Sequence, residues 1–230
     1  PEELAHKVCR IPWELWVNPA IPLEIESHVE YSRVSHEGLV SDLVYRGIER
    51  SIRDALGVRT SLKRETAPSG LIQKILVHHS KNHCQISLDT SGSHLHERGY
   101  RLEHAGAPLR ETLAAAIILK TGWDGSTPLV DGMCGSGTFP IEGALIARRL
   151  PPGLRRDFLF QMWPSFQKKT WDHLCERARG AAVNGPIMPM IGIDLDNESI
   201  RISEQNAVRA GVGGDIDWKQ MSFFDFDPGT

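Results

Sequence analysis

A glycine-rich turn between a short hydrophobic strand and a helix limits this chain's fold more than any other feature. Leu129 and Val130 end the predicted strand, and Asp131 follows them. Glycines at 132, 135 and 137 then lead into a helix that begins near Thr138. Glycine permits positive φ angles and leaves room for a ligand to approach the backbone. The start of the helix offers free N–H groups and the positive end of a dipole. The pattern predicts a strand–turn–helix unit that binds a ligand.

The spacing within this turn separates three ligand classes. A P-loop needs a lysine after its glycines, and none is present. A dinucleotide fingerprint needs a third glycine where this chain has Pro140. An acid followed by Gly-x-Gly after a strand is the turn of S-adenosylmethionine (SAM) methyltransferases, and the alternative is a tight turn that holds no ligand. The residues that we expect to contact SAM are Asp131, Met133, Cys134, Gly135, Ser136, Gly137 and Thr138.

A second acid supports a nucleoside cofactor. Residues 190–193 form a hydrophobic strand that ends in Asp194. A carboxylate at the end of the next strand is placed to accept the ribose hydroxyls, and we include the neighbouring Leu195 among the cofactor-binding residues. Asp194 lies well beyond the usual ~20 residues from the turn, so we expect an insertion over roughly residues 151–171. The alternative is a helix cap, a role that we assign to Asp196 or Asn197.

Strands and helices alternate in the second part of the chain. This alternation predicts an α/β fold with a parallel sheet covered on both faces. The first part reads as a smaller α+β unit that ends in a hairpin turning at Lys81 and Asn82. We expect helices at 38–56, 108–120, 138–149, 165–182 and 198–210, and strands at 22–31, 70–78, 84–88, 128–130, 190–193 and 216–221.

Composition excludes several other classes of protein. The chain has 230 residues, of which 40% are apolar and 24% charged, as in globular domains. No apolar run reaches the ~18 residues of a membrane span. The four cysteines and ten histidines form no ligand pattern, so we expect no metal and a reduced, cytoplasmic protein with no membrane partner. Nothing in the sequence sets the oligomeric state.

The net charge of the chain is −3. A basic surface can therefore only be a local cluster of residues. At 100° per residue one face of the helix at 38–56 carries three arginines, while its valines and isoleucines face away. Such a stripe suits contacts to RNA phosphates, and the alternative is a solvated face paired with Glu49 and Asp54. The residues that we expect to contact RNA are Arg46, Arg50, Arg53, Lys63 and Arg64, with Arg59 extending the cluster.

Two further groups of polar residues have structural interpretations. We interpret Arg98, Tyr100 and Arg101 as a clamp between domains, with a position near the cofactor or target base as the alternative. A second basic group reads as solvated surface, and its members are Arg148, Arg149, Arg155 and Arg156.

Several motifs in a fixed order resemble the THUMP-domain RNA methyltransferases. They lie at residues 96–101, 107–115, 131–138, 160–163, 192–196 and 206–212. The match runs from about residue 85 to 220 and is most like the branch that methylates the guanine exocyclic amine in bacterial 23S ribosomal RNA. The resemblance implies a THUMP-type RNA-binding module at 1–94, incomplete at its start. It also implies a Rossmann-like SAM methyltransferase domain at 95–230, incomplete at its end.

The chain departs from this family at three kinds of position. Gly132 and Pro140 replace residues that are usually proline-like and aliphatic, which leaves the turn possible. Ser222, which we include among the cofactor-binding residues, stands where many relatives place an acid for the adenine amine, and Asp225 follows three residues later. The family's catalytic Asn-Pro-Pro-[Tyr/Phe] loop does not occur, so we expect the catalytic residues after Thr230 and no methyl transfer by these 230 residues alone. The alternatives are an RNA-binding or assembly module with a vestigial methyltransferase fold, and an NAD-dependent oxidoreductase.

Overall fold

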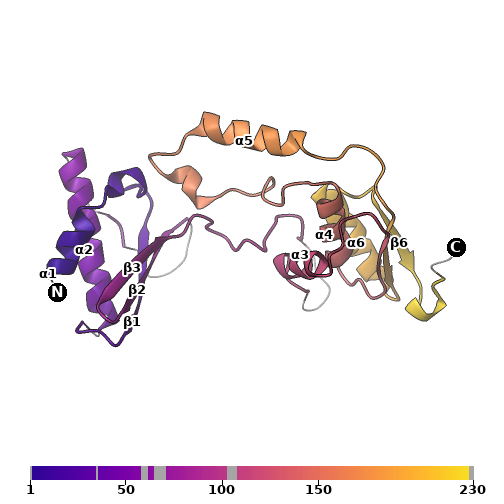
Figure 1. The fold of residues 1–230 in the computed structure, drawn as a ribbon, viewed down its shortest axis with the longest axis horizontal. Helices are drawn as coiled ribbons and strands as arrows, with labels where there is room; N and C mark the ends of the chain where they lie inside the picture. Colours follow the sequence, from indigo (N-terminus) through magenta and orange to yellow (C-terminus); the bar gives the residue numbers. More distant parts are fainter. Residues whose placement is uncertain (1, 35, 58–61, 65–70, 103–107, 228–230) are drawn as a thin grey trace. The chain divides into compact units, whose positions relative to one another are not determined.

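The computed structural model describes residues 2–34, 36–57, 62–64, 71–102 and 108–227. The chain divides into two compact units (Figure 1). Unit 1 consists of Pro1–Ser93 and Asp157–Lys168, and unit 2 of His94–Arg156 and Lys169–Thr230. Unit 1 therefore includes a segment that follows the first half of unit 2 in the sequence.

The described residues of unit 1 form a three-stranded mixed sheet, two α-helices and two short 3-10 helices. Strand β1 pairs in parallel with β2, and β2 pairs antiparallel with β3, giving the order β1-β2-β3. Positive φ angles at Lys81 and Asn82 form the tight turn of the predicted hairpin, which is confirmed. The elements are α1 (Glu2–Cys9), η1 (Trp13–Leu15), β1 (Leu23–Glu30), α2 (Glu37–Leu56), β2 (Gln73–Ser80), β3 (His83–Leu88) and η2 (Leu159–Met162).

The core of unit 1 lies along one face of α2. Val40, Val44, Ile48 and Ile52 are fully buried there, as the helical periodicity predicts. Gly47 lets α1 approach α2 closely, because a Cβ atom at this position would lie 2.8 Å from a backbone oxygen of α1. The α2 helix was thus predicted correctly, whereas the short α1 was not.

Unit 2 contains a parallel three-stranded sheet in the order β4-β5-β6. Leu129 pairs with Met190, and Met190 pairs with Ile216. The predicted parallel sheet is confirmed. Helix α3 begins at Glu111, three residues after the predicted start at Pro108. The elements are α3 (Glu111–Lys120), β4 (Leu129–Asp131), α4 (Thr138–Ala147), α5 (Lys168–Gly180), β5 (Met190–Asp194), α6 (Asn197–Ala210), β6 (Ile216–Gln220) and η3 (Phe223–Asp225).

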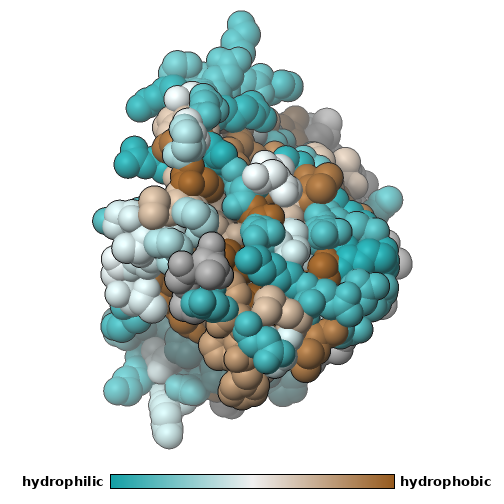
Figure 2. All heavy atoms as spheres, turned by 90° about the vertical axis from the view of Figure 1, so that its right-hand side faces the viewer, coloured by the Kyte–Doolittle hydropathy of each residue, from teal (hydrophilic) through white to brown (hydrophobic). Residues whose placement is uncertain are grey.

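Helices α4 and α6, which connect the strands of unit 2, lie on one face of its sheet (Figure 1). Helix α4 contacts β4, β5 and α6, and α6 also contacts β5 and β6. The expectation that helices cover both faces is therefore wrong for the described residues. Successive strands are added in one direction, and right-handed crossovers then place both helices on the same side. Figure 2 shows apolar side chains among polar ones on the side of the molecule that it presents. Among the described residues, no helix is long and apolar enough to cross a membrane.

Candidate cofactor-binding site

Two strand-terminal carboxylates and the glycine-rich turn meet at one edge of the unit 2 sheet. Asp131 ends β4 and Asp194 ends β5, and the parallel register places Asp131 opposite Gly192. The Gly135 N–H donates to Asp194 Oδ2 at 2.9 Å, and the Asp196 N–H donates to Asp194 Oδ1 at 3.0 Å. The structure thus brings the two acids and the turn together, as the sequence predicts.

Asp131 and Asp194 form an electronegative pair. Asp131 Oδ1 accepts a hydrogen bond from the Met133 N–H at 3.2 Å. Burial raises the pKa of the Asp131 carboxyl, and the charge of Asp194 raises it further. In the parts of the chain that the structure describes, neither carboxylate has an ion pair with a basic side chain. A cationic group from a ligand would therefore be stabilised here.

Two buried polar side chains of α6 donate hydrogen bonds to backbone carbonyls of the glycine-rich turn. Ser203 Oγ donates to the Gly135 carbonyl at 2.8 Å, and Asn206 Nδ2 donates to the Ser136 carbonyl at 3.2 Å. Both side chains are fully buried. Their role was not predicted from the sequence, although their spacing of three residues on one buried helix face was an available signal.

Glycine is favoured at different positions of the turn for different structural reasons. Gly135 and Gly137 have φ angles of +53° and +79°, in the left-handed region that favours glycine. A Cβ atom at Gly135 would meet no atom of the described residues within 4 Å, so the backbone there faces open space in this part of the structure. A Cβ atom at Gly132 would lie 2.2 Å from the Phe223 ring, which packs directly over this residue. The open space fits a ligand that approaches the backbone at Gly135.

The remaining predicted cofactor residues occupy distinct environments. Met133 and Leu195 are 84% and 71% exposed, so both offer apolar surface beside the acids. Cys134 is buried, and burial together with the two nearby carboxylates raises the pKa of its thiol to about 12. Ser222 Oγ accepts a hydrogen bond from the Phe224 N–H at 3.3 Å and caps η3.

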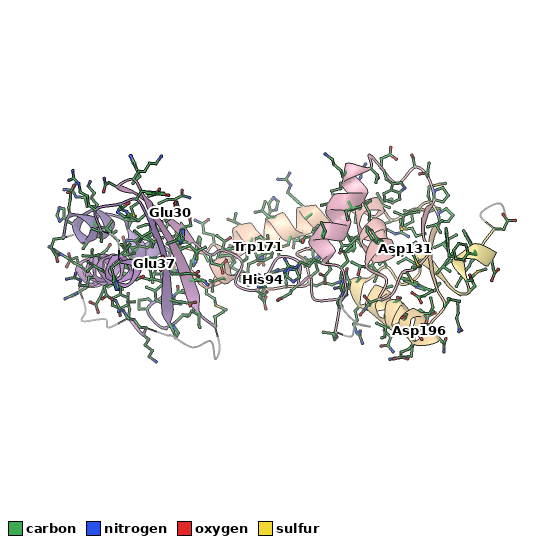
Figure 3. All side chains as sticks on the ribbon, turned by 90° about the horizontal axis from the view of Figure 1, so that it is seen from below. Glu30, Glu37, His94, Asp131, Trp171 and Asp196 are labelled. Carbon is green, nitrogen blue, oxygen red and sulfur yellow. The ribbon has the colours of Figure 1, made fainter. Side chains whose placement is uncertain are left out.

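The acid that follows Asp194 by two residues has a structural role. Asp196 caps α6, and its carboxylate accepts hydrogen bonds from the Glu198 and Ser199 N–H groups. This assignment is confirmed. Asp131 and Asp196 both lie at ends of regular elements in unit 2 (Figure 3).

The expectation of an interdomain clamp is wrong for the contacts that Arg98, Tyr100 and Arg101 make in the structure. The Tyr100 hydroxyl donates to Glu142 Oε1 at 3.0 Å, and Arg98 Nε lies 3.1 Å from the same oxygen. Arg101 donates to Thr138 Oγ1 at 2.7 Å, which holds the first residue of α4. All of these partners belong to unit 2. The sequence alone did not indicate that Glu142 of α4 contacts Arg98 and Tyr100.

The basic residues predicted to contact RNA lie in unit 1, and most have acidic neighbours. Arg46 pairs with Glu2 at 3.5 Å, Arg50 with Asp54 at 3.7 Å, and Arg53 with Glu49 at 3.6 Å. Arg64 pairs with Asp42 at 2.7 Å and stacks over the Tyr45 ring, while Lys63 is exposed. Exposed pairs of this kind are worth ~0–1 kcal/mol each, so phosphates can still compete for these arginines. Arg59 lies outside the described residues.

Within the described ranges, no group of three or more His, Cys, Asp or Glu side chains is arranged to hold a metal ion.

The parallel sheet, the glycine-rich turn and the paired acids define unit 2 as a Rossmann-like α/β domain of the methyltransferase class. Residues 98–229 match the family model UPF0020, described as the RMKL-like methyltransferase domain. The chain belongs to this family. The predicted Rossmann-like α/β methyltransferase fold is thereby confirmed for this part of the chain.

Three relatives show how far the similarity extends. The chain is 34% identical over 228 residues to "Putative RNA methyltransferase slr0064" of Synechocystis sp., covering 99% of this chain and 58% of the relative. It is 34% identical to the ribosomal RNA large subunit methyltransferase K/L of Syntrophotalea carbinolica, covering 98% of this chain and 32% of the relative. Among solved structures, SMU.472, titled "a putative methyltransferase complexed with SAH", has a TM-score of 0.82 at 29% identity, with 100% of this chain and 60% of that chain covered. The chain thus spans between 32% and 60% of the length of these relatives.

Proposed function

We propose that this chain supplies the SAM-binding part of an RNA methyltransferase. The cofactor expected from the sequence is supported by membership of a methyltransferase family and by a relative solved with SAH. The observation that carries the proposal is the Asp131–Asp194 pair, which has no basic partner among the described residues and is tied to the turn by the Gly135 N–H. SAM brings an ammonium and a sulfonium, and both are cations that this pair would stabilise.

Each part of the site has a proposed role toward SAM. Asp194 accepts hydrogen bonds from the two ribose hydroxyls through lone pairs that the Gly135 and Asp196 N–H groups do not use. Asp131 faces the ammonium, and the backbone from Gly135 to Gly137 faces the methionine end. Leu195 and Phe223 offer exposed apolar surface for the adenine ring, with Ser222 beside it.

The site disfavours the rival cofactor NAD. Its pyrophosphate would approach a turn flanked by two carboxylates, which repel it. Pro140 occupies the place of the third glycine of the dinucleotide fingerprint and is buried in the first turn of α4. The same charges that favour SAM therefore oppose NAD.

The chemistry proposed for these residues is binding and orientation. SAM supplies an electrophilic methyl group, and the chain holds it at the open edge of the sheet. Proximity and alignment of an acceptor amine would carry most of the rate. No residue among the described ranges is assigned as catalytic, and we keep the expectation that an Asn-Pro-Pro-[Tyr/Phe] loop after Thr230 positions the target amine.

The substrate that we propose is RNA, most specifically the guanine N2 amine in 23S ribosomal RNA. The names of the Synechocystis and Syntrophotalea relatives support an RNA substrate. We further propose that unit 1 is a THUMP-type RNA-binding module. The exposed basic stripe of α2, defined as Arg46, Arg50 and Arg53, would contact phosphates there by displacing its weakly held acidic partners.

The test is methyl transfer from tritiated SAM, using the protein expressed from its own gene. Unmodified 23S ribosomal RNA, 16S ribosomal RNA and transfer RNA are compared as substrates, and labelled nucleosides are identified by chromatography. The proposal predicts N2-methylguanosine in 23S RNA. Label in N6-methyladenosine, or in 16S or transfer RNA alone, would contradict the substrate assignment. Absence of label in every RNA, with SAM bound, would contradict the enzymatic function.

A further inference from the structure

Unit 2 contains a cavity that shares no residue with the proposed SAM site. Its volume is about 400 Å³, within the ~300–1,000 Å³ range of small-molecule sites. It lies among the segment before α3, the carboxyl-terminal ends of α4, α5 and α6, and the loop after α4. Its lining residues are Arg98, Tyr100, Leu145, Leu150, Pro151, Pro152, Leu154, Arg155, Arg179 and Ala210.

The wall of this cavity carries three arginines and no acidic side chain in the described part of the chain. Arg98 is only 8% exposed. Its guanidinium is held from behind by Glu142, whose Oε1 lies 3.1 Å from Arg98 Nε and also accepts the Tyr100 hydroxyl at 3.0 Å. Arg98 is therefore a buried and oriented cation, not a mobile surface charge.

Arg155 and Arg179 supply the other two charges. Arg155 packs against two glycines with positive φ: a Cβ atom at Gly99 would lie 3.0 Å from its carbonyl oxygen, and one at Gly211 would lie 2.5 Å from its guanidinium. Within the described ranges, Arg155 and Arg179 have neither a hydrogen bond nor an ion pair from their side chains. Two cations without counter-ions thus face the same space as Arg98.

The net field in the cavity favours an anion. The carboxyl-terminal ends of α4, α5 and α6 contribute roughly −0.5 charge each. Even together with Glu142, which pairs with Arg98, these negative charges are smaller than the three full charges of the arginines. The lining also includes apolar side chains, among them Leu150, Pro152 and Leu154. A ligand that suits both kinds of side chain carries a phosphate on one end and a flat or apolar group on the other.

We propose that this cavity binds one nucleotide of a single-stranded RNA segment, with the phosphate on the three arginines and the base against the apolar side chains. The proposal rests on the proposed function in taking RNA as the substrate. Helix α6 begins three residues after Asp194 of the proposed SAM site and ends at Ala210 in the cavity lining, a length of about 20 Å at 1.5 Å per residue. The cavity therefore holds a nucleotide some distance from the target base and contributes affinity and register, not chemistry.

The experiment measures binding of fluorescein-labelled ten-nucleotide oligoadenylate and oligouridylate to the 230-residue chain across a series of salt concentrations. The test variant is Arg155→Ala with Arg179→Ala, which removes two exposed side chains. The matched control is Lys169→Ala with Arg177→Ala, which removes two exposed positive charges from α5 outside the cavity. Two lost phosphate contacts should lower the log–log salt slope by about 1.4 and weaken binding about 25-fold at 0.1 M salt. The control pair should leave both quantities nearly unchanged.

Three results would overturn the inference. The cavity variant could bind both oligonucleotides as tightly as the unmodified chain does. The control variant could weaken binding as much as the cavity variant, which would mean that RNA responds to the overall positive charge and not to the cavity. Alternatively, adenosine monophosphate could bind in an Arg155- and Arg179-dependent way while the oligonucleotides do not, which would make the ligand a free nucleotide. SAM affinity is measured in the same variants. If unmodified protein binds SAM while the RNA effects fail, only this inference fails; if it does not bind SAM, the proposed cofactor site fails by itself.

Discussion

Replacing Asp194 by alanine tests the proposed cofactor site through one side chain with two separable roles. In the structure its carboxylate accepts the Gly135 N–H at 2.9 Å and the Asp196 N–H at 3.0 Å. In the proposed complex the same carboxylate also accepts the two ribose hydroxyls. Asp194→Ala therefore loosens the turn and removes the ribose contact together.

The two losses have different magnitudes and different readouts. Hydrogen bonds to a charged group contribute ~1.5–3 kcal/mol each when buried. Because Asp194 is only partly buried, we expect unit 2 to lose about 2 kcal/mol of unfolding free energy. Loss of the ribose contacts should cost ~1.5–3 kcal/mol of binding free energy, or ~10–150-fold in SAM affinity.

The assay is isothermal titration calorimetry of SAM with the unmodified chain, Asp194→Ala and Asp196→Ala. The Asp196 variant is the matched control, because it loses the α6 cap at a cost of ~1 kcal/mol without losing a proposed SAM contact. Its SAM affinity should stay within about twofold of the unmodified chain, a spread of ~0.4 kcal/mol. Asp194→Asn provides a second test if the alanine variant does not fold. A folded Asp194 variant with unchanged SAM affinity would refute the assignment of this residue to the ribose.

Two further predictions concern RNA and pH. If the basic stripe of α2 contacts phosphates, replacing all three of its arginines with alanine should lower the salt slope of RNA binding by about 2, measured by fluorescence anisotropy. An unchanged slope would leave the stripe as a solvated face paired with its acids. Burial raises the pKa of Glu142 to about 7, so the folded state holds a proton that the unfolded state releases near pH ~4.3. The contribution of Glu142 to stability is thus complete below that pH and is lost as pH rises through 7. Urea unfolding of the unmodified chain should show a loss on the order of 2–3 kcal/mol from pH 5 to 8 that Glu142→Gln lacks; equal pH dependence of the two proteins would contradict this.

The parts of the fold that the sequence predicted are those with strong local patterns. The apolar face of α2, the Lys81-Asn82 hairpin turn and the alternation of strands and helices in unit 2 each depend on residues close in sequence. The Asp196 cap and the approach of Asp131 to Asp194 followed from the same logic, because parallel strands end at one edge of a sheet.

The features that the sequence did not predict depend on contacts between distant segments. The placement of residues 157–168 in unit 1 and the burial of Arg98 against Glu142 depend on such contacts. The same holds for Phe223 over Gly132, whose partners are far apart in the chain. The packing of α4 and α6 on the same face of the sheet follows from strand order, which periodicity does not encode. The acidic partners of the basic stripe were partly visible, since Glu49 and Asp54 lie four residues from Arg53 and Arg50.

The central claim is that the acids and the glycine-rich turn of unit 2 form a SAM site. Its most direct test is calorimetric titration of the unmodified 230-residue chain with SAM, SAH and NAD⁺ under identical conditions. We predict saturable binding of SAM and SAH to one site, mutual competition between them, and no binding of NAD⁺. Binding of NAD⁺ in competition with SAM, or no binding of SAM by a folded chain, would contradict the account.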